Sequence, residues 1–202
     1  MIITEISKLQ TICEEVSSIE EGEEIGAQLL KVLAESKNGI GLAANQIGIN
    51  KQVCVVNVKK PIVLINPRIV EQSEDTFVFP EGCLSFPNKH IRTTRFVEVI
   101  VEADNHKGQL SFSADSNNMN DAFECACVQH EMDHLSGVTM FDREWKQKPY
   151  RAPKKFGRNE RVMITNGKES KEIKYKKAEP LIASGKWEIY TPAMVEPGSY
   201  GK

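Results

Sequence analysis

Apolar residues recur at helical spacing in two stretches of the chain. The first stretch covers residues 23–37, with charged residues between its apolar positions Ile25, Leu29, Leu30, Val32 and Leu33. Residues that recur every three to four positions share one face of a helix, so this pattern predicts an amphipathic helix ending near Asn38-Gly39. The second stretch, Asn120–Leu135, predicts another helix that ends before Gly137; its apolar positions are Ala122, Phe123, Ala126, Cys127 and Val128.

Short runs rich in β-branched residues predict strands between the two helices. These runs are Lys51–Val58 and Pro61–Ile65. Two further strands are expected over Phe96–Val101, where charged and apolar residues alternate, and over Gln109–Phe112. The last two flank the polar stretch Asp104–Gly108, which predicts a turn between a strand and its return strand.

The character of the chain changes after Arg143. Trp145–Lys155 is rich in proline and lysine and has no apolar period, which predicts a linker. Beyond it, Asn166-Gly167 separates two strand-like runs, Arg161–Thr165 and Lys168–Tyr175. This dipeptide suits a two-residue hairpin turn with positive φ at both central positions. A short helix is expected over Ala178–Ser184, stopped by Gly185, and a frayed end over Thr191–Lys202. We therefore predict a domain over residues 1–146 and an extension, a basic linker plus small β-hairpin, over 147–202.

The charge of the chain is unevenly distributed. The 202 residues carry a net charge of −2, but residues 143–177 hold 13 of the 26 Lys and Arg residues and only four acids. This segment has a local net charge of +9, so the remainder carries about −11. A basic segment on an acidic body suits an anionic partner such as RNA, DNA or the ribosome. A solvated, poorly ordered surface segment has the same composition and is the simpler interpretation.

The composition predicts a cytoplasmic protein without a membrane anchor. The N-terminus lacks a basic region followed by a long apolar run, and no apolar run approaches the length of a membrane span. The five cysteines are odd in number and irregularly spaced, so free thiols in a reducing cytosol are expected rather than disulfides.

The stretch Gln129–His134 carries the strongest chemical signal. His130 and His134 are four residues apart on a predicted helix, so both imidazoles can reach one metal ion, with Glu131 beside it. A catalytic metal site usually has three protein ligands and a water, which leaves one ligand to find. A zincin-type peptidase would supply a histidine or glutamate downstream, but no histidine follows His134 and Glu144 lies beyond the expected helix end.

An upstream cysteine is the better candidate for the third ligand. Cys83 stands in the glycine- and proline-rich stretch Pro80–Pro87, and a thiolate is a strong ligand for Zn²⁺ or Fe²⁺. A lone cysteine is more often a small buried apolar residue. That interpretation is the default for the other four cysteines, which are Cys13, Cys54, Cys125 and Cys127.

A third segment, Gly39–Gly48, combines small residues with one buried amide. Its glycines and alanines permit close backbone approach, although a helix cap followed by a tight buried strand would look the same. Gln46 is a lone polar side chain among small apolar residues and would need a buried partner. An oxygen atom at the metal site would accept a hydrogen bond from its amide.

Taken in order, these three segments resemble the signature motifs of peptide deformylases. Those motifs read Gly-x-Gly-x-Ala-Ala-x-Gln, Glu-Gly-Cys-Leu-Ser and Gln-His-Glu-x-Asp-His-Leu, and the chain matches all three without a substitution in the defining residues, at 39–46, 81–85 and 129–135. The similarity covers roughly residues 1–143. It implies an α+β fold with mostly antiparallel sheets packed around a central helix that carries the His-Glu-x-x-His motif.

The resemblance also implies a reaction and a set of site residues. The reaction is the hydrolysis of the N-formyl group from the N-terminal methionine of nascent polypeptides, with release of formate. One divalent metal ion would be bound by Cys83, His130 and His134, natively Fe²⁺, with Zn²⁺ or Ni²⁺ as alternatives. Glu131 would move the proton, while the Gln46 amide and the Leu84 backbone N–H would donate to the oxyanion. Substrate would contact Gly39, Ile40, Gly41, Glu81, Gly82, Phe123, Ala126 and Cys127, and Asp133 would orient a ligand or cap local structure.

Two departures from the resemblance bear on partners. Many bacterial relatives have an arginine seven residues after the ligand cysteine, near the second residue of the peptide, where this chain has His90 with Arg92 close by. A C-terminal helix of many relatives, which helps some of them dock on the ribosome, is replaced here by the linker and hairpin. Residues 161–188 resemble a hairpin-plus-Gly-Trp appendage of phage proteins, which suggests a phage-encoded enzyme acting in a bacterial host cell.

Two other functions compete with this interpretation. A zincin-like metallopeptidase would use the same histidine pair but needs a downstream ligand. A catalytically idle module would bind RNA or the ribosome through residues 143–177.

Overall fold

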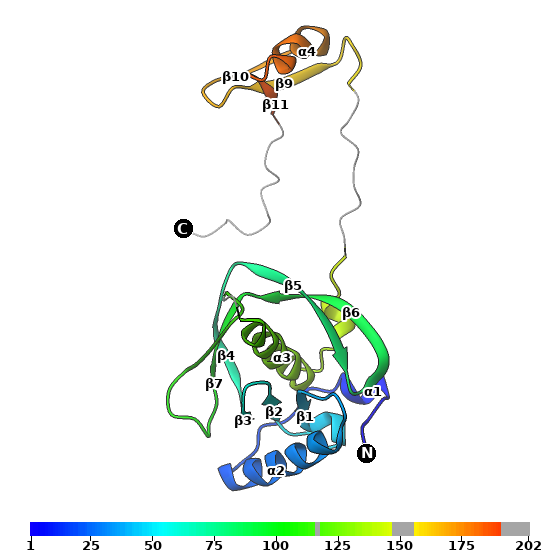
Figure 1. Ribbon diagram of the computed structural model, residues 1–202, viewed down its shortest axis with the longest axis vertical. Coiled ribbons are helices and arrows are strands. Elements are labelled where there is room, and N and C mark those ends of the chain that lie inside the picture. Colours follow the sequence, from blue (N-terminus) through cyan, green and yellow to red (C-terminus); the bar gives the residue numbers. More distant parts are fainter. Residues whose placement is uncertain (116–117, 147–155, 191–202) are drawn as a thin grey trace. The chain divides into compact units, whose positions relative to one another are not determined.

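The computed structural model describes residues 1–115, 118–146 and 156–190, which belong to two compact units. The N-terminal unit is Met1–Gln147 and the C-terminal unit is Lys148–Lys202 (Figure 1). Most of the expected linker and the expected frayed end over Thr191–Lys202 lie outside the described residues. No helix in the described part of the chain is long and apolar enough to span a bilayer.

The two helices predicted for the N-terminal unit are present. The helix α2 spans Ile19–Glu35 and starts four residues earlier than predicted, because the Ser18 side chain accepts a hydrogen bond from the Glu21 N–H and caps it. The helix α3 spans Met119–Leu135, close to its predicted bounds. A single helical turn, α1 (Ile6–Leu9), precedes them, and two 3₁₀ turns complete the unit: η1 (Ala44–Ile47) and η2 (Met140–Arg143).

Three antiparallel sheets surround α3, as predicted for this α+β fold. The strands of the first sheet, in spatial order, are β1 (Gly41–Ala43), β2 (Val53–Asn57) and β3 (Pro61–Ile65). Those of the second are β4 (Arg68–Gln72), β7 (Glu98–Glu102) and β8 (Leu110–Ser113). The third sheet is a long hairpin of β5 (Thr76–Cys83) and β6 (Phe86–Phe96).

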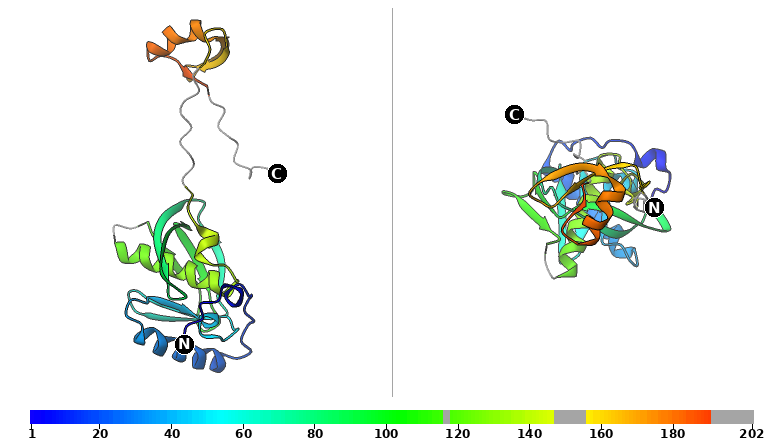
Figure 2. Two further views of the ribbon diagram at one scale, coloured as in Figure 1. Left: turned by 90° about the vertical axis from the view of Figure 1, so that its right-hand side faces the viewer. Right: turned by 90° about the horizontal axis from the view of Figure 1, so that it is seen from above.

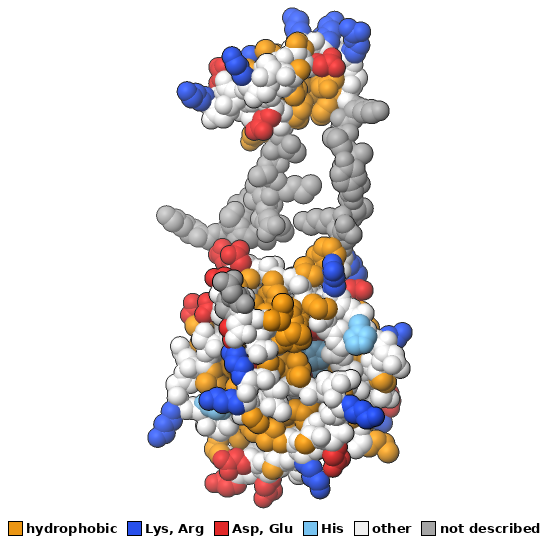
Figure 3. Space-filling view, viewed as in Figure 1, with side chains coloured by type: hydrophobic (Ala, Val, Ile, Leu, Met, Phe, Trp, Pro, Cys, Tyr) orange, Lys and Arg blue, Asp and Glu red, His pale blue; other side chains and the backbone are white. Residues whose placement is uncertain are grey.

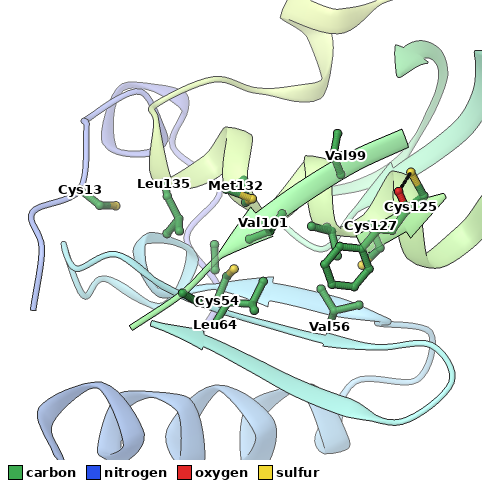
Figure 4. Close-up of a cluster of buried hydrophobic side chains, with 14 residues drawn as sticks. Cys13, Cys54, Val56, Leu64, Val99, Val101, Cys125, Cys127, Met132 and Leu135 are labelled. Atoms are coloured by element: carbon green, nitrogen blue, oxygen red, sulfur yellow. Dashed lines mark hydrogen bonds between the residues drawn. The ribbon is translucent and has the colours of Figure 1, made fainter. Parts of the chain in front are cut away.

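The sheet β1-β2-β3 is covered on both faces. Side chains alternate between the faces of a strand, and both sets on β2 are buried. Val53 and Val55 pack in a core cluster with α2, whereas Cys54 and Val56 pack in a cluster with α3. Figure 2 (left) shows α2 against one face of this sheet, and Figure 4 shows the cluster on the side of α3. Because α3 is enclosed in this way, polar groups on it can be held away from water.

The hairpin β5–β6 is the main difference from the sequence-based expectation. No strand was predicted over 86–96, and the predicted strand Phe96–Val101 has the wrong start, because Phe96 ends β6 and β7 begins at Glu98. The reason is that only three of the eleven residues of β6 are buried, so its sequence lacks a run of apolar residues. The pairing of Cys83 with Phe86 closes the hairpin and places Leu84 and Ser85 in the turn.

The C-terminal unit is a small sheet with one helix. Its elements are β9 (Arg161–Thr165), β10 (Ser170–Lys174), α4 (Tyr175–Ala183) and β11 (Glu188–Ile189), with β9 in the middle of the sheet. The buried centre is formed by Val162, Ile164 and Ala178, and the Lys171 ammonium lies 3.9 Å from the centroid of the Trp187 ring. The hairpin was predicted, but the third strand was not.

The predicted two-residue turn of this hairpin is wrong. Thr165 pairs with Ser170, so four residues connect the paired strands, and of Asn166 and Gly167 only Gly167 has a positive φ, of 83°. The Asn166 side-chain oxygen accepts hydrogen bonds from the N–H groups of Lys168 and Glu169. This side-chain bonding stabilises the longer turn.

Close packing of α2 on β3 depends on a glycine. A Cβ atom at Gly26 would lie 2.5 Å from a Val63 methyl carbon. We expect Gly26→Ala to lower the free energy of unfolding of the N-terminal unit by about 1–3 kcal/mol, although alanine favours a helix more than glycine does. Urea unfolding measures this. The added Val63→Ala should recover part of the loss, and a double mutant that shows only the sum of the two single losses would contradict the clash.

Candidate metal centre

Three potential metal ligands from two elements converge in the N-terminal unit. Cys83 is the last residue of β5, and His130 and His134 lie one turn apart on α3. The ligand atoms of these residues all lie within 4.8 Å of one another, and the Cys83 Sγ is 3.3 Å from the His134 Nε2. The cysteine that closes the group comes from upstream of the histidines, and no downstream acid of the described residues joins it.

Glu131 lies beside this group with one carboxylate oxygen unpaired. Its side chain is buried, and its Oε2 has no hydrogen-bond partner among the described residues. The other oxygen, Oε1, lies where a side chain at Gly41 would have to be, next to the Cys127 sulfur. Gly41 therefore makes the room that this carboxylate occupies.

The Gln46 side chain directs its amide nitrogen toward Cys83 of the metal group. The residue is 1% exposed, and its Oε1 accepts a hydrogen bond of 2.8 Å from the Ala43 N–H. With the oxygen held in this way, Nε2 donates to the Ser85 hydroxyl at 3.1 Å and lies 3.4 Å from the Cys83 Sγ. The buried partner that the sequence demanded for Gln46 is thus the turn of the β5–β6 hairpin, which also contains Leu84.

A network of buried ion pairs contacts the Nδ1 side of the His130 ring. Its Nδ1 lies 2.9 Å from one oxygen of Glu81, and Arg95 binds both oxygens of Glu81 at 2.6 and 2.8 Å. Arg95 also binds Asp133 at 2.5 Å, and the more exposed Arg143 binds Asp133 at 2.7 Å. Glu81 was expected to contact substrate. Its carboxylate oxygens are instead bonded to the Arg95 guanidinium and the His130 imidazole. Sequence reasoning missed Arg95, since nothing in its neighbourhood distinguishes it from a surface arginine.

A cavity of about 450 Å³ opens onto the metal group. All eight residues expected to bind substrate line it, as do Gln46, Cys83, Leu84, His130 and Glu131. At its apolar end the Phe123 ring meets Phe79 edge-on, with 5.0 Å between ring centroids. His90 lines the wall, whereas His134 does not. Figure 3 shows hydrophobic side chains gathered on one face of the N-terminal unit.

Comparison with known sequences identifies the family. The sequence model of the polypeptide deformylase family matches residues 2–150. The chain belongs to the peptide deformylase family. It is 36% identical to a peptide deformylase of Pseudoalteromonas translucida over 67% of this chain and 80% of that protein. It is 35% identical to one of Neisseria gonorrhoeae over 78% of this chain and 93% of that protein.

Solved structures of deformylases resemble the N-terminal unit. The peptide deformylase of Thermotoga maritima superposes with a TM-score of 0.64 at 28% identity, over 72% of this chain and 97% of that one. A peptide deformylase of Synechococcus elongatus, solved in complex with actinonin, gives a TM-score of 0.62 at 33% identity, over 73% of this chain and 79% of that one.

Membership confirms the predicted family and activity. The chain is a hydrolase of the deformylase family, which removes the formyl group from the N-terminal methionine of polypeptides. Deformylases are metalloenzymes, and the convergence of Cys83, His130 and His134 offers a metal-binding group. The zincin-like and catalytically idle alternatives are not favoured.

The electrostatics of this deformylase site suit a cation. Burial alone would lower the pKa of His130, but its contacts with Cys83 and Glu81 and the charge of Glu131 raise it to about 10. The surroundings thus favour a positive charge at this point. Burial and the charge of His130 lower the pKa of His134 to about 3, so that imidazole stays neutral, as a ligand must. One thiolate and two imidazoles form a donor set that suits Zn²⁺ or Fe²⁺.

The pKa values of Glu131 and Glu81 are shifted in opposite directions. Burial raises the pKa of Glu131 to about 7, against the attraction of His130. Burial also acts to raise the pKa of Glu81, but hydrogen bonds from Arg95 and His130 outweigh it and lower the value to about 2. Of the two buried carboxylates, Glu131 is therefore the one suited to exchanging a proton near neutral pH.

Removal of Arg95 should be far more costly than removal of a surface arginine. We expect Arg95→Met to lower the free energy of unfolding by about 3–5 kcal/mol, because Glu81 and Asp133 would lose their buried partner. The matched control is Arg68→Met, whose ion pair with Asp104 is solvent-exposed, with N–O 3.3 Å, and should cost less than about 1 kcal/mol. Urea unfolding of both variants measures the difference, and equal losses would contradict a buried network.

Proposed function

We propose that Cys83, His130 and His134 hold one divalent ion, natively Fe²⁺, which Zn²⁺ or Ni²⁺ can replace. The observation that carries the proposal is the convergence of their ligand atoms within 4.8 Å beside the unpaired Glu131 carboxylate. When bound, such an ion lowers the pKa of water and polarises a carbonyl oxygen. The exchangeability of the metal is consistent with a donor set of intermediate softness.

Glu131 moves the proton in this proposal. It takes a proton from the attacking water and later delivers it to the amine nitrogen of methionine as the bond to the formyl carbon breaks. Its burial, its unpaired Oε2 and a pKa near 7 support both steps, since a group that titrates close to neutral pH can accept and release a proton.

Two N–H donors stabilise the oxyanion that develops on the formyl oxygen. These are the Gln46 side-chain amide, held by Ala43 and Ser85, and the Leu84 backbone N–H in the β5–β6 turn. Donors that are already oriented need no rearrangement during the reaction, and loss of one such donor typically costs about 3–4 kcal/mol of transition-state stabilisation.

The cavity accounts for recognition of formylmethionine. The methionine side chain enters the apolar end beside Phe123, Ala126 and Cys127. The peptide backbone pairs with the Gly39–Leu42 segment, because β1 is an edge strand and can accept one more strand. Gly82 and Glu81 border the opposite side on β5. His90, in place of a frequent arginine, sets the preference for the next peptide residue.

A formate-release assay with formyl-Met-Ala-Ser tests the reaction. We expect turnover by protein purified without oxygen, loss of turnover with a chelator, and recovery with Fe²⁺ or Ni²⁺. Metal analysis of the same sample identifies the native ion. No turnover with restored metal would contradict the proposal and favour a binding module.

Cys83→Ala distinguishes the upstream ligand from a zincin-like site. We expect this variant to lose its metal and at least a hundredfold of its activity, because two imidazoles alone bind weakly. Cys13→Ala, at a buried cysteine that packs in the core, should keep both. Retention of metal and activity by Cys83→Ala would exclude the proposed ligand set.

The C-terminal unit and its linker are proposed to bind the ribosome in the cytoplasm, where nascent chains emerge. The support is the local charge of +9 over residues 143–177, since ribosomal RNA is a polyanion. The N-terminal unit has its own hydrophobic clusters and contains the whole metal group. Docking and chemistry are therefore separable in this proposal.

Deletion of residues 147–202 tests the division of roles. We expect turnover of formyl-Met-Ala-Ser to stay within about twofold, because the site lies in the N-terminal unit. Cosedimentation with ribosomes should weaken, and binding by the full chain should fall steeply with salt. Equal ribosome binding by the full and shortened chains would contradict docking through this segment.

A further inference from the structure

Asn45 is a buried polar residue tied to the end of the metal-bearing helix. It precedes Gln46 in η1, is 5% exposed, and donates from Nδ2 to the His134 backbone oxygen at 2.6 Å. A second, longer contact of 3.4 Å runs from Nδ2 to the Leu9 oxygen. Both contacted atoms are carbonyl oxygens, which only accept, so the orientation of the amide is determined: Nδ2 faces them and Oδ1 points elsewhere.

Asn45 and His134 each have one buried side-chain atom without a hydrogen-bond partner in the described residues. These atoms are the Asn45 Oδ1 and the His134 Nδ1. The other ring nitrogen of His134, Nε2, faces the Cys83 sulfur at 3.3 Å, so Nε2 is the nitrogen available to a metal. A neutral imidazole that ligates through Nε2 carries its proton on Nδ1. His134 Nδ1 is then a donor and Asn45 Oδ1 an acceptor, and the two are complementary.

Leaving both atoms unsatisfied would cost about 1–3 kcal/mol each. Buried polar groups are therefore almost always paired, directly or through an ordered water that makes several hydrogen bonds. Ligand histidines commonly donate their second N–H to an oxygen, which sets the tautomer and the ring orientation. Two buried side-chain oxygens of the described residues lack a partner, those of Asn45 and Glu131, and of these two residues Asn45 is the one that also hydrogen-bonds to the His134 backbone.

We propose that Asn45 is a positioning residue for the metal ligand His134. It donates to the His134 carbonyl directly, and its Oδ1 accepts a hydrogen bond from an ordered water that in turn accepts one from the His134 Nδ1–H. This inference rests on the proposed metal site. It gives η1 a second role: the same 3₁₀ turn directs Gln46 toward the oxyanion and Asn45 toward the metal ligand His134. Asn45 stands at one of the unspecified positions of the first motif, so the motif does not reveal this role.

Two substitutions separate positioning from simple packing. Asn45→Ala leaves space in which a water can still meet the His134 Nδ1. Asn45→Leu fills the same volume with an apolar side chain and excludes that water. We expect Co²⁺ affinity, measured by competition with a chelator, to fall in the order wild type, Asn45→Ala, Asn45→Leu, with a loss of about tenfold to hundredfold for leucine. The thiolate-to-Co²⁺ absorption band should shift in both variants.

The control is another asparagine with the same exposure. Asn66 is also 5% exposed and binds the Val16 backbone through both side-chain atoms, with no contact to the metal group. Asn66→Ala should lower the unfolding temperature while leaving Co²⁺ affinity and the absorption band unchanged. If Asn45 has only a structural role, both Asn45 variants should likewise have a lower unfolding temperature with unchanged Co²⁺ affinity and an unchanged absorption band.

The outcomes separate the inference from the function on which it rests. If wild-type protein binds Co²⁺ and both folded Asn45 variants bind it equally tightly with an unshifted band, the positioning role is wrong. If one variant fails to fold, the other decides on the same criterion. If wild-type protein binds no Co²⁺ through Cys83, as shown by a missing thiolate band, the proposed metal site itself fails.

Discussion

The site depends on one compensated set of buried charges. Glu81 on β5 and Asp133 on α3 both pair with Arg95 on β6, in a place where isolated charges would be very costly. Because Glu81 also meets the His130 Nδ1, the same contacts that join the β5–β6 hairpin to α3 orient a ligand histidine. Cys83 ends the strand that carries Glu81. The ion network therefore links the strand that ends at Cys83 to the helix that carries both histidines.

Small residues create the room in which this chemistry occurs. Gly41 leaves space for the Glu131 carboxylate and the Cys127 sulfur. A Cβ atom at Gly39 would lie only 2.9 Å from a Leu84 methyl carbon. The glycines of the first motif therefore matter because they have no side chain. At the end of the motif, Asn45 and Gln46 direct their amide groups toward His134 and Cys83. A loop of larger residues would separate β1 from α3 and close the cavity.

The metal group lies within one of the two units. All the residues that surround the metal group lie in the unit Met1–Gln147, and the family match covers residues 2–150. The C-terminal unit has its own sheet, helix and buried centre.

Much of this protein could be predicted from its sequence. The spacing of His130 and His134 predicted a shared face, and apolar periodicity predicted α2 and α3 within a few residues, because helix geometry is local. Three motifs in order indicated the family. Local pattern failed for β6, in which only three of eleven residues are buried, and for the hairpin at Asn166, where a side chain bonds to the backbone beyond it. Only the tertiary structure decided that Arg95 is buried between two acids and that Asn45 reaches the carbonyl of His134, 89 residues away. Such pairings depend on which surfaces meet when the sheets close around α3, and no property of the neighbouring residues encodes them.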